Sequence, residues 1–125
     1  MCVSLLENEN IDDFKPFKAH SSDAAFDLIN AEEKEVVLAP NERRLFSAGF
    51  KMELPIGWEA QIRPRSGNAL KKGITVLNTP GTIDANYRGV VGVILYNSSK
   101  NESQVIKRGD KIAQMVIQRV EDVSL

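Results

Sequence analysis

The sequence predicts an all-β domain of the sandwich, barrel or jelly-roll type, and three observations support this prediction. Turn signals recur at short intervals, for example at Pro55-Ile56-Gly57, Pro80-Gly81 and Asn97-Ser98-Ser99. The segments between these turns are too short for ordinary helices and are rich in branched and aromatic residues. Residues 58–63 alternate between apolar and polar side chains, which is the period of a strand with one buried face.

The individual elements follow from the same signals along the chain. Branched and aromatic residues predict strands over residues 34–38, 45–54, 58–63, 90–96 and 112–120. A short helix is favoured only over residues 66–72, because Ala69-Leu70-Lys71 suits helical geometry and Ser66 can cap the N-terminus. We find no internal repeat and no linker, so residues 1–125 are expected to form a single domain.

Composition narrows the classes of function. A formal charge of −1 argues against a protein that coats nucleic acid, so a small substrate is expected. Cys2 is the only cysteine, which suits a reducing, cytoplasmic compartment and excludes a disulfide framework. His20 is the only histidine, so neither a zinc site nor a histidine-activated nucleophile is expected. No stretch has the pattern of a signal peptide or a membrane span.

The stretch from Asn78 to Gly89 places one carboxylate, Asp84, beside a tight turn and the aromatic ring of Tyr87. The apolar run that follows, residues 90–96, predicts that both residues lie on a hairpin anchored in the core. A positioned carboxylate can orient a water molecule and take its proton. Taken alone, however, an aspartate near Pro-Gly is more often an ordinary turn residue.

Arg65-Ser66-Gly67 combines a cation, a hydroxyl and a glycine that leaves its backbone N–H accessible to phosphate oxygens. An isolated motif of this kind is usually a capped turn with a surface arginine. Both motifs therefore need support from the rest of the chain.

That support comes from four segments in a fixed order. Residues 23–28, 64–69 followed by Gly73-Ile74, 78–89 and 109–114 are similar to the first four motifs of the trimeric dUTP pyrophosphatases (dUTPases). The resemblance covers most of the chain. It implies a distorted jelly-roll fold of the β-clip type with one short helix, assembled as a homotrimer with shared active sites.

The resemblance also implies a reaction, the hydrolysis of dUTP to dUMP and pyrophosphate. Asp84 would activate the water that attacks the α-phosphorus, and Tyr87 would lie against the deoxyribose and exclude a 2′-hydroxyl. Asn78 would contact uracil. Further contacts to the base would come from the main chain of Thr82, Ile83 and Gly92.

The remaining implied roles concern the phosphates. Arg65, Ser66, Gly67 and Gln114 match the family's phosphate-binding positions, whereas Asp27 and Asp110 are expected to organise local hydrogen bonds and the subunit contact. Mg²⁺ is implied as a cofactor that the substrate phosphates carry, because the sequence has no tight cluster of carboxylates. No nucleic acid or membrane partner is expected.

Two alternatives remain open at this stage. The 125 residues contain no glycine-rich fifth motif, the arm that closes over the family's active site, so we expect dUTP binding with slow hydrolysis. A binding or regulatory module without efficient catalysis is the first alternative. The related dCTP deaminases are the second, but Ala85-Asn86-Tyr87 after Asp84 departs from their usual proline-glycine-aromatic pattern.

Overall fold

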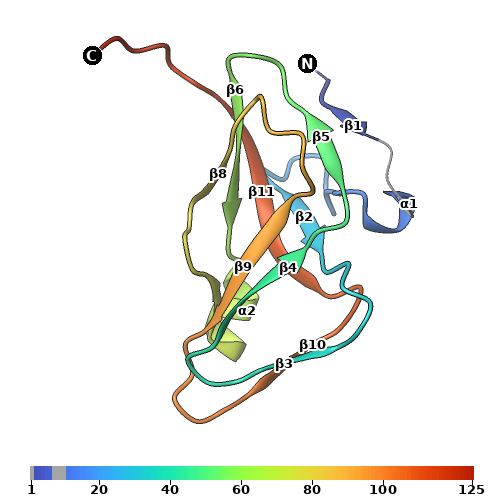
Figure 1. Ribbon diagram of the computed structural model, residues 1–125, viewed down its shortest axis with the longest axis vertical. Coiled ribbons are helices and arrows are strands. Elements are labelled where there is room, and N and C mark those ends of the chain that lie inside the picture. Colours follow the sequence, from blue (N-terminus) through green and yellow to red (C-terminus); the bar gives the residue numbers. More distant parts are fainter. Residues whose placement is uncertain (1, 7–10) are drawn as a thin grey trace.

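The computed structural model describes residues 2–6 and 11–125, which form short antiparallel strands and two short helices (Figure 1). In chain order the elements are β1 (Ser4–Leu6), α1 (Ile11–Phe14), β2 (Phe26–Ile29), β3 (Val36–Leu38), β4 (Arg43–Ser47), β5 (Lys51–Glu53), β6 (Trp58–Arg63), α2 (Ser66–Lys72), β7 (Ile74–Val76), β8 (Gly81–Ile83), β9 (Gly92–Asn97), β10 (Gln104–Ile106) and β11 (Lys111–Arg119).

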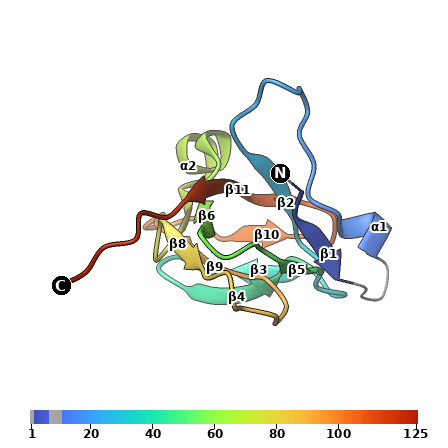
Figure 2. The same cartoon turned by 90° about the horizontal axis from the view of Figure 1, so that it is seen from above.

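Two larger sheets enclose the core. One has the order β2-β11-β6-β8 and the other β4-β9-β7, while β1-β5 and β10-β3 form two-stranded ribbons. Figure 2 shows β2 and β11 on one side of the molecule and β3 and β4 on the other. Alternating side chains from both sheets meet between them and are almost completely buried, among them Leu28, Ile62, Met115, Phe46, Val76 and Leu95. The predicted all-β fold with a short helix is confirmed.

Several predicted elements agree closely with the structure. β6 and α2 occupy the expected residues, and alternating residues of β6 point into the core. The strand predicted over residues 45–54 is instead divided into β4 and β5. Gly49, at a φ of 75°, interrupts it, because this left-handed conformation does not continue a strand. The helical turn α1 was not predicted, and neither helix is long and apolar enough to cross a membrane.

The expected cap of the helix over residues 66–72 was wrong. Arg65, not Ser66, occupies the N-cap position of α2, with no side-chain hydrogen bond to the helix, and Ser66 is the first helical residue. The Arg65 side chain is directed elsewhere, to Asp27. At the other end Gly73 adopts a φ of 66° and donates its N–H to the main chain of Ala69. The left-handed C-terminal glycine is therefore the stop signal that the structure uses.

A bulge in β11 determines which of its side chains face outward. The pairing of β11 with β2 shifts between Lys111 and Ala113, and the successive residues Ile112 and Ala113 are both buried. Because an extra residue changes the phase of alternation, Gln114 then lies on the outer face. There it pairs with Arg63 on β6 and with Asp27 on β2.

Two asparagines with fully buried side chains hold neighbouring segments in place. The Asn30 amide donates to the carbonyl of Lys107 at 3.0 Å, and its side-chain oxygen accepts the N–H of Glu32. Asn97 donates to the carbonyls of Leu38 and Glu102 at 3.0 and 2.8 Å. Buried polar groups are stable only when they are paired in this way. These bonds fix the β3-β10 ribbon and the β2–β3 loop against the sheets.

Candidate active site

A cleft of about 290 Å³ opens between the two larger sheets, and we call it the Asp84 cleft. Six residues singled out from the sequence line it: Asn78, Thr82, Ile83, Asp84, Tyr87 and Gly92. Apolar side chains form most of the remaining wall: Leu45, Ile62, Val76, Val90, Val93 and Ile94. The mouth of the cleft is exposed, since Asp84 and Tyr87 both face solvent. The cleft is thus a mainly apolar slot with a carboxylate, an amide and a ring along its edge.

The segment that carries Asp84 joins two sheets and does not form the expected hairpin. β8 pairs with β6, whereas β9 pairs with β4 and β7. The N–H of Tyr87 donates to the carbonyl of Asp84 at 3.1 Å, which closes a tight turn. The prediction was wrong because both strands pair with partners distant in sequence, and a local pattern does not specify such pairing. The turn therefore lies where the two sheets diverge.

Arg88 stabilises this turn through its side chain. Its guanidinium donates to the carbonyls of Ala85 and Tyr87 and lies 3.7 Å from the Glu53 carboxylate on β5. A planar group with several donors is suited to holding two carbonyls at once. The sequence analysis did not select Arg88, because its contacts with Ala85, Tyr87 and Glu53 are visible only in the folded chain.

A second cleft, of about 480 Å³, lies over the outer face of the β2-β11-β6-β8 sheet, and we call it the Arg65 cleft. It brings together five predicted residues, namely Asp27, Arg65, Ser66, Gly67 and Gln114. It also contains two cations that the sequence analysis did not select, Arg63 and Lys111. Arg63 was detectable, since it alternates with buried Ile62 on β6 and so must point outward.

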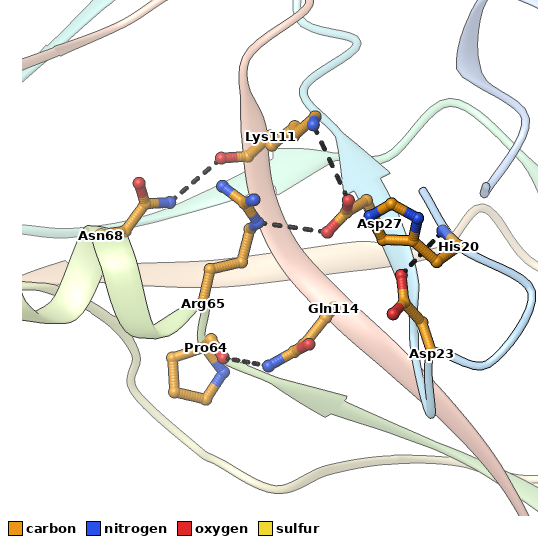
Figure 3. A network of polar contacts seen from close by, with 8 residues as sticks. All are labelled: His20, Asp23, Asp27, Pro64, Arg65, Asn68, Lys111 and Gln114. Carbon is orange, nitrogen blue, oxygen red and sulfur yellow. Dashed lines mark hydrogen bonds and ion pairs between the residues drawn. The ribbon is translucent and has the colours of Figure 1, made fainter. Parts of the chain in front are cut away.

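Side chains of the Arg65 cleft make several polar contacts, with Asp27 between two cations (Figure 3). The Nε of Arg65 donates to the Asp27 carboxylate at 3.1 Å, and the Lys111 ammonium lies 3.9 Å from the same carboxylate. Gln114 donates from its amide to the carbonyl of Pro64 at 2.9 Å. One carboxylate thus orients two cations, and within residues 2–6 and 11–125 the terminal nitrogens of Arg65 have no hydrogen-bond partner and can reach an anion.

Asp110 lies outside both clefts. Its carboxylate accepts the N–H of Lys107 at 2.8 Å, and its own N–H donates to the carbonyl of Lys107 at 3.1 Å. These bonds close the turn that leads into β11. The structure therefore places Asp110 among local turn contacts.

The two clefts lie on opposite faces of β6. Ile62 lines the Asp84 cleft and Arg63, the next residue, lines the Arg65 cleft. Adjacent side chains of a strand point to opposite faces of its sheet, so the sheet itself separates the two clefts. No lining residue is common to both. Within one chain the two clefts therefore open on different faces of the sheet.

Comparison with known proteins identifies the family. The family model described as dUTPase matches residues 13–125. The chain belongs to the dUTPase family. A relative from Clostridium novyi named deoxyuridine 5'-triphosphate nucleotidohydrolase is 56% identical over 90% of this chain and 78% of its own length. One of the same name from Trichodesmium erythraeum is also 56% identical, over 88% of this chain and 75% of its own length.

Solved dUTPase structures have the same fold. A mutant dUTPase from phage phi11 of S. aureus, described with a structural Mg(II) ion, superposes with a TM-score of 0.86 at 25% identity. The alignment covers 100% of this chain and 95% of that one. The dUTPase from Streptococcus mutans gives a TM-score of 0.84 at 22% identity, covering 98% of both chains. The arrangement of sheets described above is thus a dUTPase fold.

Proposed function

We propose that this chain hydrolyses dUTP to dUMP and pyrophosphate, as one domain over residues 1–125. The observation that carries the proposal is the convergence of Asp84, Tyr87 and Asn78 on one apolar cleft, in a chain whose relatives are named for dUTP hydrolysis. Apolar walls with a few placed polar groups are typical of sites for small ligands.

Asp84 is the residue that we assign to catalysis. Hydrolysis at phosphorus requires a water molecule aimed in line with the leaving group, and a carboxylate can hold that water and accept its proton. Asp84 lies at the exposed mouth of its cleft, and no hydrogen bond or ion pair is recorded for its carboxylate within the described chain. Its oxygens are therefore available to a water molecule beside the α-phosphate.

The rest of the Asp84 cleft would hold the nucleoside. The Asn78 amide offers both a donor and an acceptor to the edge of uracil. Main-chain groups of Thr82, Ile83 and Gly92 would complete the base contacts. A Cβ on Gly92 would stand only 2.8 Å from Cδ1 of Leu45. The glycine therefore leaves space beside Leu45 that a larger residue would fill. The Tyr87 ring would lie against the deoxyribose, where a ribose hydroxyl would be crowded and unpaired.

The Arg65 cleft would hold the phosphates. Arg65, Ser66, Gly67 and Gln114 supply a cation, a hydroxyl, an accessible backbone and an amide. Asp27 fixes Arg65 by their 3.1 Å contact, and Asp110 supports the turn before β11. Arg63 and Lys111 add positive charge. Charge-assisted hydrogen bonds to phosphate are among the stronger polar contacts that a protein makes.

We infer that the complete site forms between neighbouring copies in a homotrimer. The sheet separates the two clefts of one chain, yet a dUTP molecule must contact a nucleoside site and a phosphate site at once. The Arg65 cleft of one subunit facing the Asp84 cleft of the next would satisfy both requirements, and a cyclic trimer repeats this contact three times.

Mg²⁺ fits the site as an ion carried by the substrate. Among the described residues there is no group of three or more His, Cys, Asp or Glu side chains that could hold a metal. The Asp27 carboxylate is already paired with two cations. The phosphates and water would thus supply most ligands, as Mg²⁺ commonly requires, and the ion would neutralise charge developing on phosphate oxygens. The chain's own residues orient the nucleotide and the attacking water.

We further propose that residues 1–125 acting alone hydrolyse dUTP slowly. The Asp84 cleft is open to solvent at Asp84 and Tyr87. A closing segment would exclude water and add contacts in the transition state. We expect the same residues followed by a glycine-rich segment with an arginine and an aromatic residue to be faster. Equal kcat values for the two proteins would contradict this expectation.

One assay tests the reaction and separates the alternatives. The chain is incubated with Mg²⁺ and dUTP, dCTP, dTTP or UTP, and pyrophosphate and ammonia are measured. Pyrophosphate released from dUTP alone supports the proposal. Ammonia from dCTP would indicate a deaminase instead, and tight dUTP binding without any product would indicate a regulatory module.

A further inference from the structure

Two contacts with the residues that follow it hold the ring of Tyr87. The hydroxyl donates a hydrogen bond to the main-chain oxygen of Val90 at 2.8 Å. The far edge of the ring lies over Gly89, where a Cβ would stand 2.6 Å from the hydroxyl oxygen and 2.8 Å from Cζ. Tyr87 is 45% exposed, so packing in the core does not fix the ring. The orientation of the ring depends on these two contacts.

Gly89 is needed here for space and not for backbone conformation. The glycines with positive φ in the described chain are Gly49, Gly57, Gly73 and Gly109, and Gly89 is not among them. An alanine at position 89 therefore meets no backbone strain. The three atoms nearest to its Cβ would all belong to the Tyr87 ring. Since that ring is the far end of an exposed side chain, an added Cβ would displace the ring and the fold would remain.

We propose that Gly89 and the main-chain oxygen of Val90 form a seat for the Tyr87 ring, and that this seat sets the discrimination against ribonucleotides. The inference rests on the proposed position of Tyr87 against the deoxyribose. Steric exclusion of a 2′-hydroxyl requires a ring that cannot yield. A ring that rotates away admits the hydroxyl and loses contact with the deoxyribose. Gly89 is accordingly a positioning residue that acts through Tyr87.

Gly89→Ala tests the space that the ring occupies. The 125-residue chain is purified in its native assembly, and kcat/KM is measured with dUTP and with UTP. We expect the ratio of the two values to fall about tenfold or more, because the ring is displaced. Thermal unfolding should change little, since the backbone tolerates alanine.

Tyr87→Phe tests the hydrogen bond to Val90 and has a matched control in the same chain. Removal of the hydroxyl should lower the ratio of kcat/KM for dUTP to kcat/KM for UTP about two- to tenfold. We expect a value near the lower end of this range, because water reaches the site and can replace the hydroxyl. Tyr96 also donates its hydroxyl, to Asn41 at 3.1 Å, but it lines neither cleft. Tyr96→Phe makes the same chemical change elsewhere and should leave the ratio unchanged.

A double-mutant cycle shows whether Gly89 acts through the ring. In a Tyr87→Ala background the ring is absent, so Gly89→Ala should have no further effect on the ratio. An undiminished effect in that background would overturn the assignment. So would an unchanged ratio in folded Gly89→Ala. If Gly89→Ala does not fold, Tyr87→Phe decides, and a ratio equal to that of Tyr96→Phe would refute the seat.

Failure of this inference can be told apart from failure of the proposed function. Wild-type chain that releases no pyrophosphate from dUTP would contradict the function itself. Wild-type chain that is active and selective, with variants that are equally selective, would contradict only the seat.

Discussion

The Asp84 cleft and the Arg65 cleft differ in what their walls are made of. Apolar side chains and main chain dominate the first, and it carries a single acidic side chain. Charged and polar side chains form most of the second, where Asp27 joins Arg65 and Lys111. The first takes its shape from the core, because Ile62, Val76 and Val93 belong to both. The second takes its shape from ion pairs on the surface of a sheet.

This difference indicates how one small domain can recognise both ends of a nucleotide. A flat apolar base is suited to a slot between sheets, and a polyanion is suited to an exposed face with several cations. The two surfaces face different sides of the sheet in one chain, since β6 lies between them. Association of identical chains brings unlike surfaces together.

The largest effect is expected from the one carboxylate of the Asp84 cleft. Asp84→Asn keeps the shape of the side chain but removes the base, so kcat should fall about 10²- to 10⁴-fold. Binding of dUTP should change far less, and isothermal titration calorimetry measures it. Asp13→Asn, at an exposed carboxylate of α1, is the control. A kcat within threefold of wild type, on the order of 0.7 kcal/mol, would remove Asp84 from the chemistry.

Mixing two impaired variants tests whether the clefts of different chains cooperate. Asp84→Asn and Arg65→Ala subunits are co-expressed in equal amounts and the assembly is assayed. Random pairing gives about a quarter of the sites both intact clefts, so about a quarter of wild-type activity should return.

The control for this experiment mixes Asp84→Asn with Asn78→Ala, which both alter the Asp84 cleft. No site in that mixture has an intact Asp84 cleft, so no recovery is expected. If Asp84→Asn and Arg65→Ala mixtures show only the mean of the two separate activities, each site belongs to one chain.

A smaller effect is expected from Arg65 by itself. Arg65→Ala removes a charged donor and leaves Asp27 paired only with Lys111 at 3.9 Å. We expect kcat/KM for dUTP to fall about tenfold to a hundredfold, the usual range for a hydrogen bond to a charged group. Arg44→Ala removes an exposed cation that lines neither cleft and serves as the control. Similar losses in both variants would point to general charge effects.

The smallest effect is expected from salt, and it should differ between ligands of the two clefts. A tenfold increase in ionic strength should weaken dUTP binding about severalfold, because salt screens the exposed cations of the Arg65 cleft. Binding of deoxyuridine, which lacks phosphates, should scarcely change. Equal weakening of both ligands would show that the two clefts do not differ in electrostatics as their side chains indicate.

The elements around the site show what local sequence specifies. The helix α2 and the strand β6 lie where the sequence predicts them, because a strict alternation and a run of helix-forming residues are local signals. The division of residues 45–54 depended on the left-handed conformation of Gly49, which a glycine permits but does not require.

Features that depend on distant partners were missed. The expected hairpin around Asp84 failed because β8 and β9 pair with strands elsewhere in the chain. The expected cap by Ser66 failed because Ser66 is already the first helical residue and Arg65 takes the N-cap position. The Arg65 side chain contacts Asp27, which lies 38 residues earlier in the chain. Lys111 was overlooked for the same reason, since its proximity to Arg65 arises only when β11 packs beside the start of α2.

The position of β6 between the clefts limits how this chain can change. No residue of the strand is fully exposed, and its alternate side chains serve the interior and the charged surface. Most strands at a surface have one side on which substitutions accumulate without penalty. Trp58–Arg63 has no such side, so we expect mutational scanning to find this hexapeptide among the least tolerant segments. Substitutions at inward-facing positions such as Ile62 should lower stability. Substitutions at outward-facing positions such as Arg63 should lower the affinity for substrate.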